Sequence, residues 1–209
     1  MIGPEGAADR AAEWLAERIP ARLRVLEERL QLPSNTLADP ARVIAHETGP
    51  IAIEDWPSVY VLPQRLERMD LVEVRGDASE VYRCRYLVRV ILWVRADSYA
   101  STDRLRKRYA LATREAFLER KQLAAPATYG GGDYGQDTSS TVVDPSGIRE
   151  DYSDVFTDDA SRTIAGAYLD VPIIVTEVLD GPTPFGTVST TPEVTTTGDT
   201  ASIPPHPAL

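Results

Sequence analysis

The sequence has little cysteine and little histidine. Among its 209 residues, Cys84 is the single cysteine, and His46 and His206 are the two histidines. One cysteine cannot form an intramolecular disulfide and cannot by itself build a cysteine-based metal site. Two histidines so far apart in sequence leave little material for a zinc site or a histidine-centred triad. The composition therefore argues against hydrolase or metalloenzyme chemistry of these kinds.

Long apolar runs are also missing. The best one is interrupted by four arginines, Arg83, Arg85, Arg89 and Arg95, and the first residues show no basic segment followed by an apolar one. We therefore expect no membrane-spanning segment and no secretory leader, and synthesis in the cytoplasm.

The net charge of −10 is unevenly placed along the chain. Residues 1–120 hold 19 basic and 19 acidic side chains, whereas residues 121–209 hold 3 basic and 13 acidic ones. All of the excess is therefore C-terminal. An acidic segment of this kind repels nucleic acid and anionic membranes, but it can bind a basic protein surface or line a passage so that DNA moves through without sticking to its wall.

The N-terminal part predicts one helical region followed by short strands. Apolar residues recur with helical spacing over 7–32, and Pro20 predicts either a kink or the start of a second helix. Short strands are expected at 43–44, 51–53 and 58–62. Because prolines flank them, we expect edge strands or extended arms.

A hairpin and a second helix follow. Strands are expected at 69–75 and 80–95 around the turn sequence GDAS at 76–79, with an odd-length loop or a bulge placing Val72 and Val74 on the face of Tyr82 and Cys84. Ser98 or Ser101 is expected to cap a helix that runs to about 122.

The last strand is expected at 167–179, and Pro172 places its first part at an edge or a bulge. The fold class is therefore α+β: a mainly antiparallel sheet with a long β-hairpin, packed against an N-terminal helix and one long helix.

Two segments stand apart from this single domain of residues 1–180. An inserted Gly/Asp-rich loop occupies about 124–160, and its acidic part at 149–161 is expected to hold a short helical turn. Residues 181–209 are rich in Thr and Pro, and we expect an extended tail that is disordered in solution.

The strand at 80–95 has one ordinary face and one unusual face. Its even positions, from Tyr82 to Val94, are all apolar and predict the core side. Its odd positions mix cations with large apolar groups: Arg83, Arg85, Leu87, Arg89, Ile91, Trp93 and Arg95. Arginines beside aromatic and aliphatic groups are typical of subunit interfaces, so we predict these seven residues as an interface. A solvated sheet face, with arginine stems over apolar neighbours, stays open as the alternative.

Other candidate sites are weaker. The sequence GGGDYG at 130–135 lacks the GKS or GKT ending of a phosphate-binding loop. Four aspartates, Asp151, Asp154, Asp158 and Asp159, do not have the spacing of a calcium loop. The basic turn RLRKRY at 104–109 and Trp56 are both more typical of helix-surface and loop-anchoring roles.

The order of these elements resembles a known family. The resemblance covers residues 5–123 and 160–180. It rests on the following order: an N-terminal helix, WPSVYVLP, YRCRYLVRVILWVRA, the helix STDRLRKRYALATREAFLER, a variable insertion and AYLDVPIIVTEVL. This order is similar to that of the small α+β neck proteins of long-tailed bacteriophages, in particular the tail terminator (tail completion) family of actinobacteriophage type. The insertion and the Thr/Pro-rich tail depart from that pattern.

The resemblance implies a structural virion protein without catalysis or cofactor. It implies a homo-oligomeric ring, a hexamer in that family, that caps the tail tube protein and joins it to the head through the head-tail connector or head-closure protein. Genomic DNA would pass through the lumen without sequence-specific binding, and no membrane would be involved. Two alternatives stay open: another neck component, such as a head-closure or connector-completion protein, and a monomeric ligand-binding or enzymatic domain with 124–160 as a lid.

Overall fold

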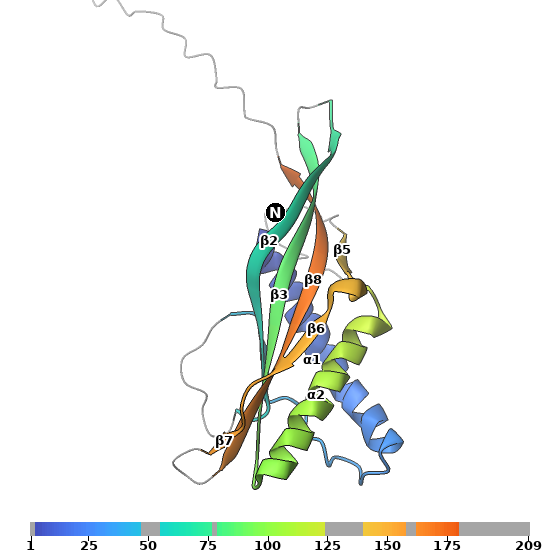
Figure 1. Cartoon of the computed structure of the whole chain (residues 1–209). Helices are drawn as coiled ribbons and strands as arrows, with labels where there is room; N and C mark the ends of the chain where they lie inside the picture. The colour runs from blue at the N-terminus through green and yellow to red at the C-terminus, as the bar shows by residue number, and fades with distance from the viewer. Residues whose placement is uncertain (1–2, 47–54, 77–78, 124–139, 158–161, 180–209) are drawn as a thin grey trace, which may run out of the picture.

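The protein is an α+β fold in which two helices cover one side of a long, twisted sheet. The computed structural model describes residues 3–46, 55–76, 79–123, 140–157 and 162–179. The helices are α1 (Gly3–Arg29) and α2 (Tyr99–Glu119). The main strands are β2 (Ser58–Val74), β3 (Glu80–Ala96) and β8 (Thr163–Leu179), which lie side by side in Figure 1. The predicted fold class is thereby confirmed.

Shorter strands complete the sheet in the order β1-β2-β3-β8-β5-β4, with β6 and β7 also paired to β8. These strands are β1 (Arg42–Ile44), β4 (Gln122–Leu123), β5 (Thr141–Val143), β6 (Arg149–Tyr152) and β7 (Phe156–Thr157). The β1–β2 pair is parallel, and the other pairs are antiparallel. The acidic part of the predicted insertion thus forms β6 and β7 instead of a helical turn, because β8 offers it an open sheet edge. The one helical turn nearby, η2 (Pro145–Gly147), precedes it.

Helix α1 runs without interruption through Pro20. The alternative of two separate helices is therefore wrong, since tertiary packing holds the chain helical on both sides of the proline. Trp14 Nε1 donates to the carbonyl oxygen of Ala116 at 2.9 Å, which ties α1 to α2. Ion pairs of Arg22 with Glu119 and of Arg29 with Glu115 continue the contact.

Helix α2 is capped by Ser98, one of the two predicted caps, and Ser101 completes a capping box. The side chain of Ser98 accepts a hydrogen bond from the backbone of Ser101, and the side chain of Ser101 accepts one from the backbone of Ser98. The reciprocal pair satisfies two backbone donors that a helix start leaves without partners. Tyr109, Ala112 and Ala116 of the predicted stripe are buried against the sheet.

Strands β2 and β3 form one hairpin that is longer than the sequence predicted. The expected strands at 58–62 and 69–75 belong to a single strand, which passes through Pro63 because a register shift lies between Pro63 and Arg65. A bulge is a place where a strand tolerates the missing proline donor. The loop after Val74 is odd in length, since Val74 pairs with Glu80, so Val74 shares the face of Tyr82. Val72 falls at another register shift and has no paired residue.

Strand β8 is a central strand, which corrects the expectation for Pro172. On one side β8 pairs with β3 over its whole length. On the other side its partner changes from β6, at Asp170, to β5, at Ile173, and Pro172 falls in this gap. No ladder hydrogen bond is therefore lost there. The strand also begins earlier than predicted, at Thr163.

The core lies between the helices and the even positions of β3. Cys84, Val88, Val90, Leu92 and Val94 are all fully buried, which confirms the predicted core face. The predicted strand at 51–53 and the tail at 181–209 lie outside the described residues.

Candidate interaction surface on the extended hairpin

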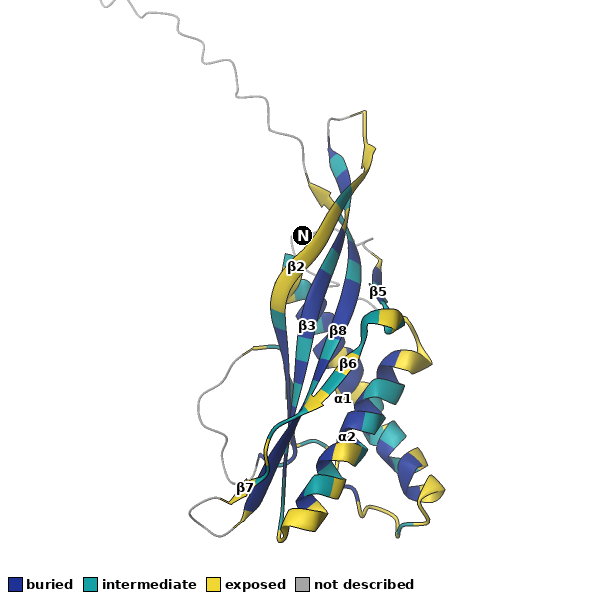
Figure 2. Ribbon diagram, viewed as in Figure 1, coloured by how far each residue is buried: buried dark blue, intermediate teal, exposed yellow. Residues whose placement is uncertain are grey.

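The distal end of the sheet extends past the helices as a three-stranded arm (Figure 1). We define the arm as residues 66–74 of β2, 80–84 of β3 and 176–179 of β8. Seven of the twelve exposed large hydrophobic side chains of the described residues lie on it: Leu66, Met69, Leu71, Val72, Val74, Val178 and Leu179. Figure 2 shows most of the distal part of β2 as exposed. Exposed apolar surface gathered in one place is typical of a protein-binding site.

The arm has an apolar side and a charged side. Paired residues of antiparallel strands point to the same side of the sheet. Met69 pairs with Cys84, and Leu71 pairs with Tyr82, so these β2 residues lie on the side that α1 and α2 cover lower down. We call this the helix face. Asp70 pairs with Arg83, which places the charged residues on the opposite side, the far face. The core pattern thus continues along the arm where no described helix covers it.

The outer edge of β2 is free of a strand partner over most of its length. Within the described residues, β1 pairs only with Ser58, Val59 and Tyr60. Register shifts follow between Pro63 and Arg65, between Leu66 and Arg68, and between Leu71 and Glu73. Such bulges interrupt an edge and limit unspecific pairing. The stretch 68–71 between the last two shifts keeps a regular register.

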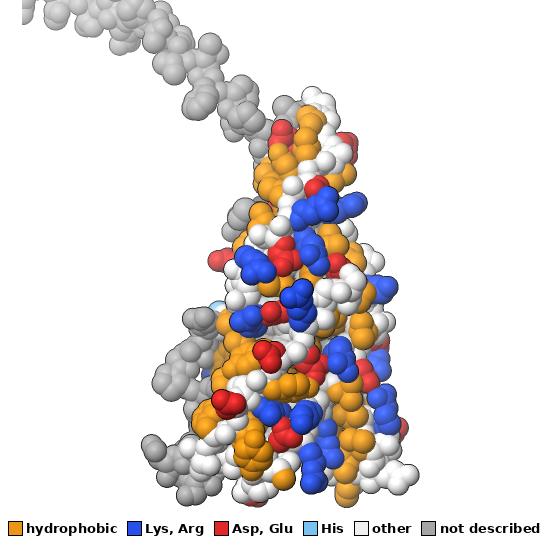
Figure 3. Space-filling model, viewed as in Figure 1, with side chains coloured by type: hydrophobic (Ala, Val, Ile, Leu, Met, Phe, Trp, Pro, Cys, Tyr) orange, Lys and Arg blue, Asp and Glu red, His pale blue; other side chains and the backbone are white. Residues whose placement is uncertain are grey.

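The far face carries the predicted interface residues, and the structure gives most of its arginines partners within the chain. Arg89 forms a two-pronged ion pair with Asp170, with Nε–Oδ1 2.7 Å and Nη2–Oδ2 3.0 Å. Arg85 contacts Glu67 at 2.8 Å and Asp144 at 3.1 Å. Figure 3 shows the resulting alternation of basic and acidic side chains along this face. These arginines therefore have carboxylate partners without a neighbouring subunit.

These ion pairs also affect ionisation. Hydrogen bonds from Ser146, opposed by partial burial and assisted by Arg85, hold the pKa of Asp144 below its ordinary value. The pKa of Arg89 is raised, chiefly by its hydrogen bonds with Asp170. Both shifts favour the charged forms of Asp144 and Arg89.

The apolar members of the predicted interface also contact their own chain. Trp93 packs edge-on against Phe156, with ring centroids 6.2 Å apart, and against Tyr168, at 6.3 Å. Leu87 is buried, and Ile91 is half-buried. Arg95 lies over the ring of Trp56, 5.3 Å from its centroid, so Trp56 helps to hold the base of the sheet. Arg83 is the exposed member of the set.

The interface assignment of these seven residues stays a prediction. What sequence reasoning missed is the exposed apolar side of β2, Leu66 to Val74. The signal was present in the apolar residues at 66, 69, 71 and 74, but two bulges, after Leu66 and after Leu71, break their alternation, so the period-two pattern that marks a strand face is lost.

A small polar cluster lies where the arm meets the core. Tyr86 donates a hydrogen bond to Glu177 at 2.9 Å, and the thiol of Cys84 lies 3.6 Å from the same carboxylate. Burial, assisted by this carboxylate, raises the pKa values of both Tyr86 and Cys84. A buried thiol with a raised pKa is a poor nucleophile and a poor metal ligand.

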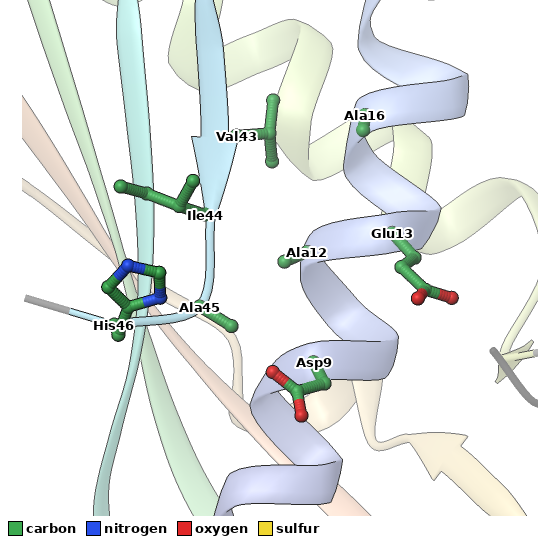
Figure 4. A pocket seen from close by; sticks show the side chains of 8 residues that line it. All are labelled: Asp9, Ala12, Glu13, Ala16, Val43, Ile44, Ala45 and His46. Atoms are coloured by element: carbon green, nitrogen blue, oxygen red, sulfur yellow. The ribbon is translucent and has the colours of Figure 1, made fainter. Parts of the chain in front are cut away.

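A groove of about 470 Å³ separates α1 from the edge strand β1. Its floor is apolar, and Ala12, Ala16 and Val43 face one another across it in Figure 4. Asp9 and Glu13 come from α1, and a second hollow next to it adds Glu5 and Leu62. The flank of α1 thus overhangs the edge of the sheet, because β1 ends after three residues.

The weaker candidate sites acquire no ligand geometry from the structure. Within the described ranges, no group of three or more potential metal-ligating His, Cys, Asp or Glu residues occurs. Asp151 accepts a hydrogen bond from the backbone of Tyr152, whereas Asp158, Asp159 and the GGGDYG sequence at 130–135 lie outside those ranges. In the basic turn, Arg106 and Lys107 both pair with Asp103. None of the described helices is long and apolar enough to cross a membrane.

The chain was compared with protein families, with curated proteins and with solved structures. No protein-family model matches the sequence, and no curated protein matches it. Among solved structures, a chain from the virion of a native gene transfer agent particle is similar over 78% of this chain and 95% of that chain. The TM-score is 0.28, and 13% of the aligned residues are identical.

Proposed function

We propose that this protein is a structural subunit of a virion, a tail terminator that forms a ring at the top of a phage tail tube and joins it to the head. The observation that carries the proposal is the arm, whose helix face keeps the apolar pattern of a core although no helix of the described residues covers it. The order of elements along the sequence, which is similar to that of tail terminators, supports the same role.

The energetics of the arm favour assembly into a larger structure over a free dimer. Full burial of an apolar side chain contributes about 1.5–3 kcal/mol. Five of the seven exposed side chains lie on the helix face, namely Leu66, Met69, Leu71, Val74 and Leu179, so burying their exposed halves contributes roughly 4–8 kcal/mol. Association costs an estimated 4–15 kcal/mol. One arm contact is thus close to balance. A ring, in which every subunit makes two such contacts, or a preformed tube end, shifts the balance towards assembly.

Ring symmetry also accounts for the free edges. A cyclic arrangement joins one edge of each subunit to the other edge of the next, and so leaves no edge exposed. The predicted far-face residues from Arg83 to Arg95 would line this assembly or contact the adjoining tube, with Arg83 as the exposed member.

Particles produced without this protein provide the test. Overlong or headless tails are the expected result for a terminator. Leaking heads would instead indicate a head-closure or connector-completion protein, the other neck component that the element order fits. Normal particles would overturn the proposal, as would a full chain that stays monomeric at high concentration even with tail tube protein added.

A further inference from the structure

We propose that residues 187–197 of the C-terminal tail add as a strand to the outer edge of β2 in the same chain, so that the three-stranded arm becomes four-stranded. The occupant of the free edge is thus a defined segment of this chain. The inference goes beyond the proposed function, because it concerns the free subunit and does not depend on what that subunit assembles with.

The outer edge of β2 is the longest strand edge without a partner in the described part of the sheet. Strand β1 pairs with it only up to Tyr60, which leaves residues 62–74 open. On the other side of the sheet, β5, β6 and β7 already pair with β8 between Thr163 and Val175. Backbone donors and acceptors at an open edge readily take up an extended segment. Strand β2 is therefore the edge with room for a further strand.

The tail has the composition of a strand between residues 187 and 197. Eight of these eleven residues are Val or Thr, which are common in strands. Gly186 and Gly198 bound the run, as turn residues commonly bound a strand. By itself the tail has too few apolar residues to build a core, which is why the sequence predicts disorder. An open sheet edge supplies the partner that it lacks.

The chain leaves β8 at the right place and in the right direction. Strand β8 ends at Leu179, which lies level with Val74 because both residues pair with Glu80. The outer side of β2 is three strand spacings from β8, or about 14 Å, and residues 180–187 can extend over about 26 Å. Because β2 and β8 both run towards the end of the arm, the returning strand is antiparallel to β2. The four strands then have the order of a Greek key, in which the fourth returns to lie beside the first.

One register matches the apolar residues of the two strands. We take the outer edge of β2 to follow the register shifts that it shows against β3. Val74 and Leu66 pair with residues of β3 that are six positions apart, and Val188 and Val194 are also six positions apart. With Val188 beside Val74, Val194 therefore lies beside Leu66, and both valines cover exposed side chains of the helix face. A slip of one residue would turn both valines to the charged far face.

The same register matches the charges on the far face. It places Glu193 beside Arg68, whose side chain is 70% exposed and pairs with Asp70 at 2.7 Å, with its outer side open to a second carboxylate. The tail contains acidic residues and no lysine or arginine, so it has no charge that Arg68 would repel. An exposed ion pair adds little free energy, so its role is to select the register.

Pro192 is compatible with this strand. The added strand is an edge strand, and alternate N–H groups of an edge strand point to solvent, where a proline is tolerated. Pro192 is an even-numbered residue, so the even positions point their N–H groups outwards. The odd positions, such as Thr191 and Thr195, then donate to β2.

Pairing within the chain is favoured over pairing with a neighbour. A short connection holds the tail near β2 at an effective concentration on the order of 1 mM, which a second copy does not reach in dilute solution. The added strand closes the open edge of β2, and so blocks unspecific pairing there. It leaves the helix face uncovered, and in a ring its outer edge takes the place of the β2 edge.

Disulfide trapping tests the pairing directly. The full chain with Val74→Cys and Val188→Cys, oxidised when dilute, should give a monomer with an internal crosslink, seen as a faster band on a non-reducing gel. The matched control, Val25→Cys with Val188→Cys, uses an exposed valine of α1 and should crosslink about tenfold more slowly. Equal rates in the two variants overturn the inference. Covalent dimers in place of the internal crosslink also overturn it, since they would place the tail on a neighbouring copy.

Proline substitution tests which residues of the tail face β2. In the wild type, the odd-numbered amides from 189 to 195 should exchange hydrogen about tenfold more slowly than in a free peptide of the same sequence. Thr195→Pro removes a donor to β2 and should abolish most of this protection. Thr196→Pro is the matched control, because its N–H points to solvent, and it should keep the protection. Free exchange in the wild type, or equal loss in both variants, contradicts the pairing.

These tests are separate from the test of the proposed function, because both use the dilute full chain. If the crosslink and the protection are absent, the added strand is wrong, whatever the particles show. If particles without the protein are normal, the proposed function fails, whatever the crosslink shows.

Discussion

The apolar helix face of the arm should be required for assembly and dispensable for folding. Leu71 and Val74 are 53% and 60% exposed, so their replacement removes little buried area from the monomer. The double change Leu71→Thr with Val74→Thr keeps residues that suit a strand. We expect the monomer to lose at most about 0.5 kcal/mol per site, as is usual for surface substitutions.

Assembly should respond more strongly. Covering the exposed half of each side chain contributes about 1 kcal/mol, so each contact between copies loses about 2 kcal/mol. This corresponds to roughly a 30-fold weaker contact. Because a closed ring contains several equivalent contacts, the loss multiplies across the ring.

Two measurements on the full chain check this. Thermal unfolding of the dilute protein reports on the fold, and sedimentation over a concentration series reports on assembly. The control is Val25→Gln with Leu118→Gln, two exposed hydrophobic residues on the helices, which should unfold and assemble like the wild type. If the arm variant assembles within about threefold of the wild type, the arm is not the contact that drives assembly.

Three further predictions concern the fold. Burial raises the pKa of Glu27, but hydrogen bonds from the backbones of Leu37 and Asn35 and the charge of Arg24 outweigh it and lower the pKa below its ordinary value. Glu27→Gln should therefore destabilise the protein at neutral pH. The difference from the wild type should vanish as the pH falls through the folded-state pKa, as measured by urea unfolding from pH 7 to 3. Gly147→Ala should cost about 1–3 kcal/mol in the same assay, because the added Cβ would lie 2.5 Å from Cγ of Pro172, and an unchanged stability would contradict this contact. Arg89→Asp should cost roughly 1 kcal/mol, since this partly exposed arginine is replaced by a second carboxylate beside Asp170, and adding Asp170→Arg should recover most of that loss.

The sequence predicts the elements whose pattern is local. The capping box at Ser98 depends on residues three apart in the chain, and the core face of β3 on an unbroken alternation from Cys84 to Val94. Both patterns survive whatever the partner elements do. The fold class follows from their order.

The rest depends on partners that the sequence does not reveal. The sequence predicts two strands in place of β2, because Pro63 and the two register shifts between Pro63 and Arg68 break its period. Pro172 is tolerated in a central strand because β5 and β6 leave a gap beside it. Both of these strands come from the segment that the sequence predicts as an insertion. Likewise, Arg85 and Arg89 could be recognised as unusual for a sheet face, but not as partners of Glu67 and Asp170.

Because of these ion pairs, Arg85 and Arg89 do not need a neighbouring subunit to supply their carboxylate partners. An arginine that faces a carboxylate across the same sheet keeps this part of the far face charged and balanced within the chain. The helix face of the arm is different, because Leu71 and Val74 continue a core pattern and stay exposed among the residues that the structure describes. For the proposed assembly, we therefore expect the strength of association to come from the uncovered helix face of the arm. A monomer–oligomer equilibrium that responds to changes at Leu71 and Val74, and not to Arg89→Asp, would support this expectation.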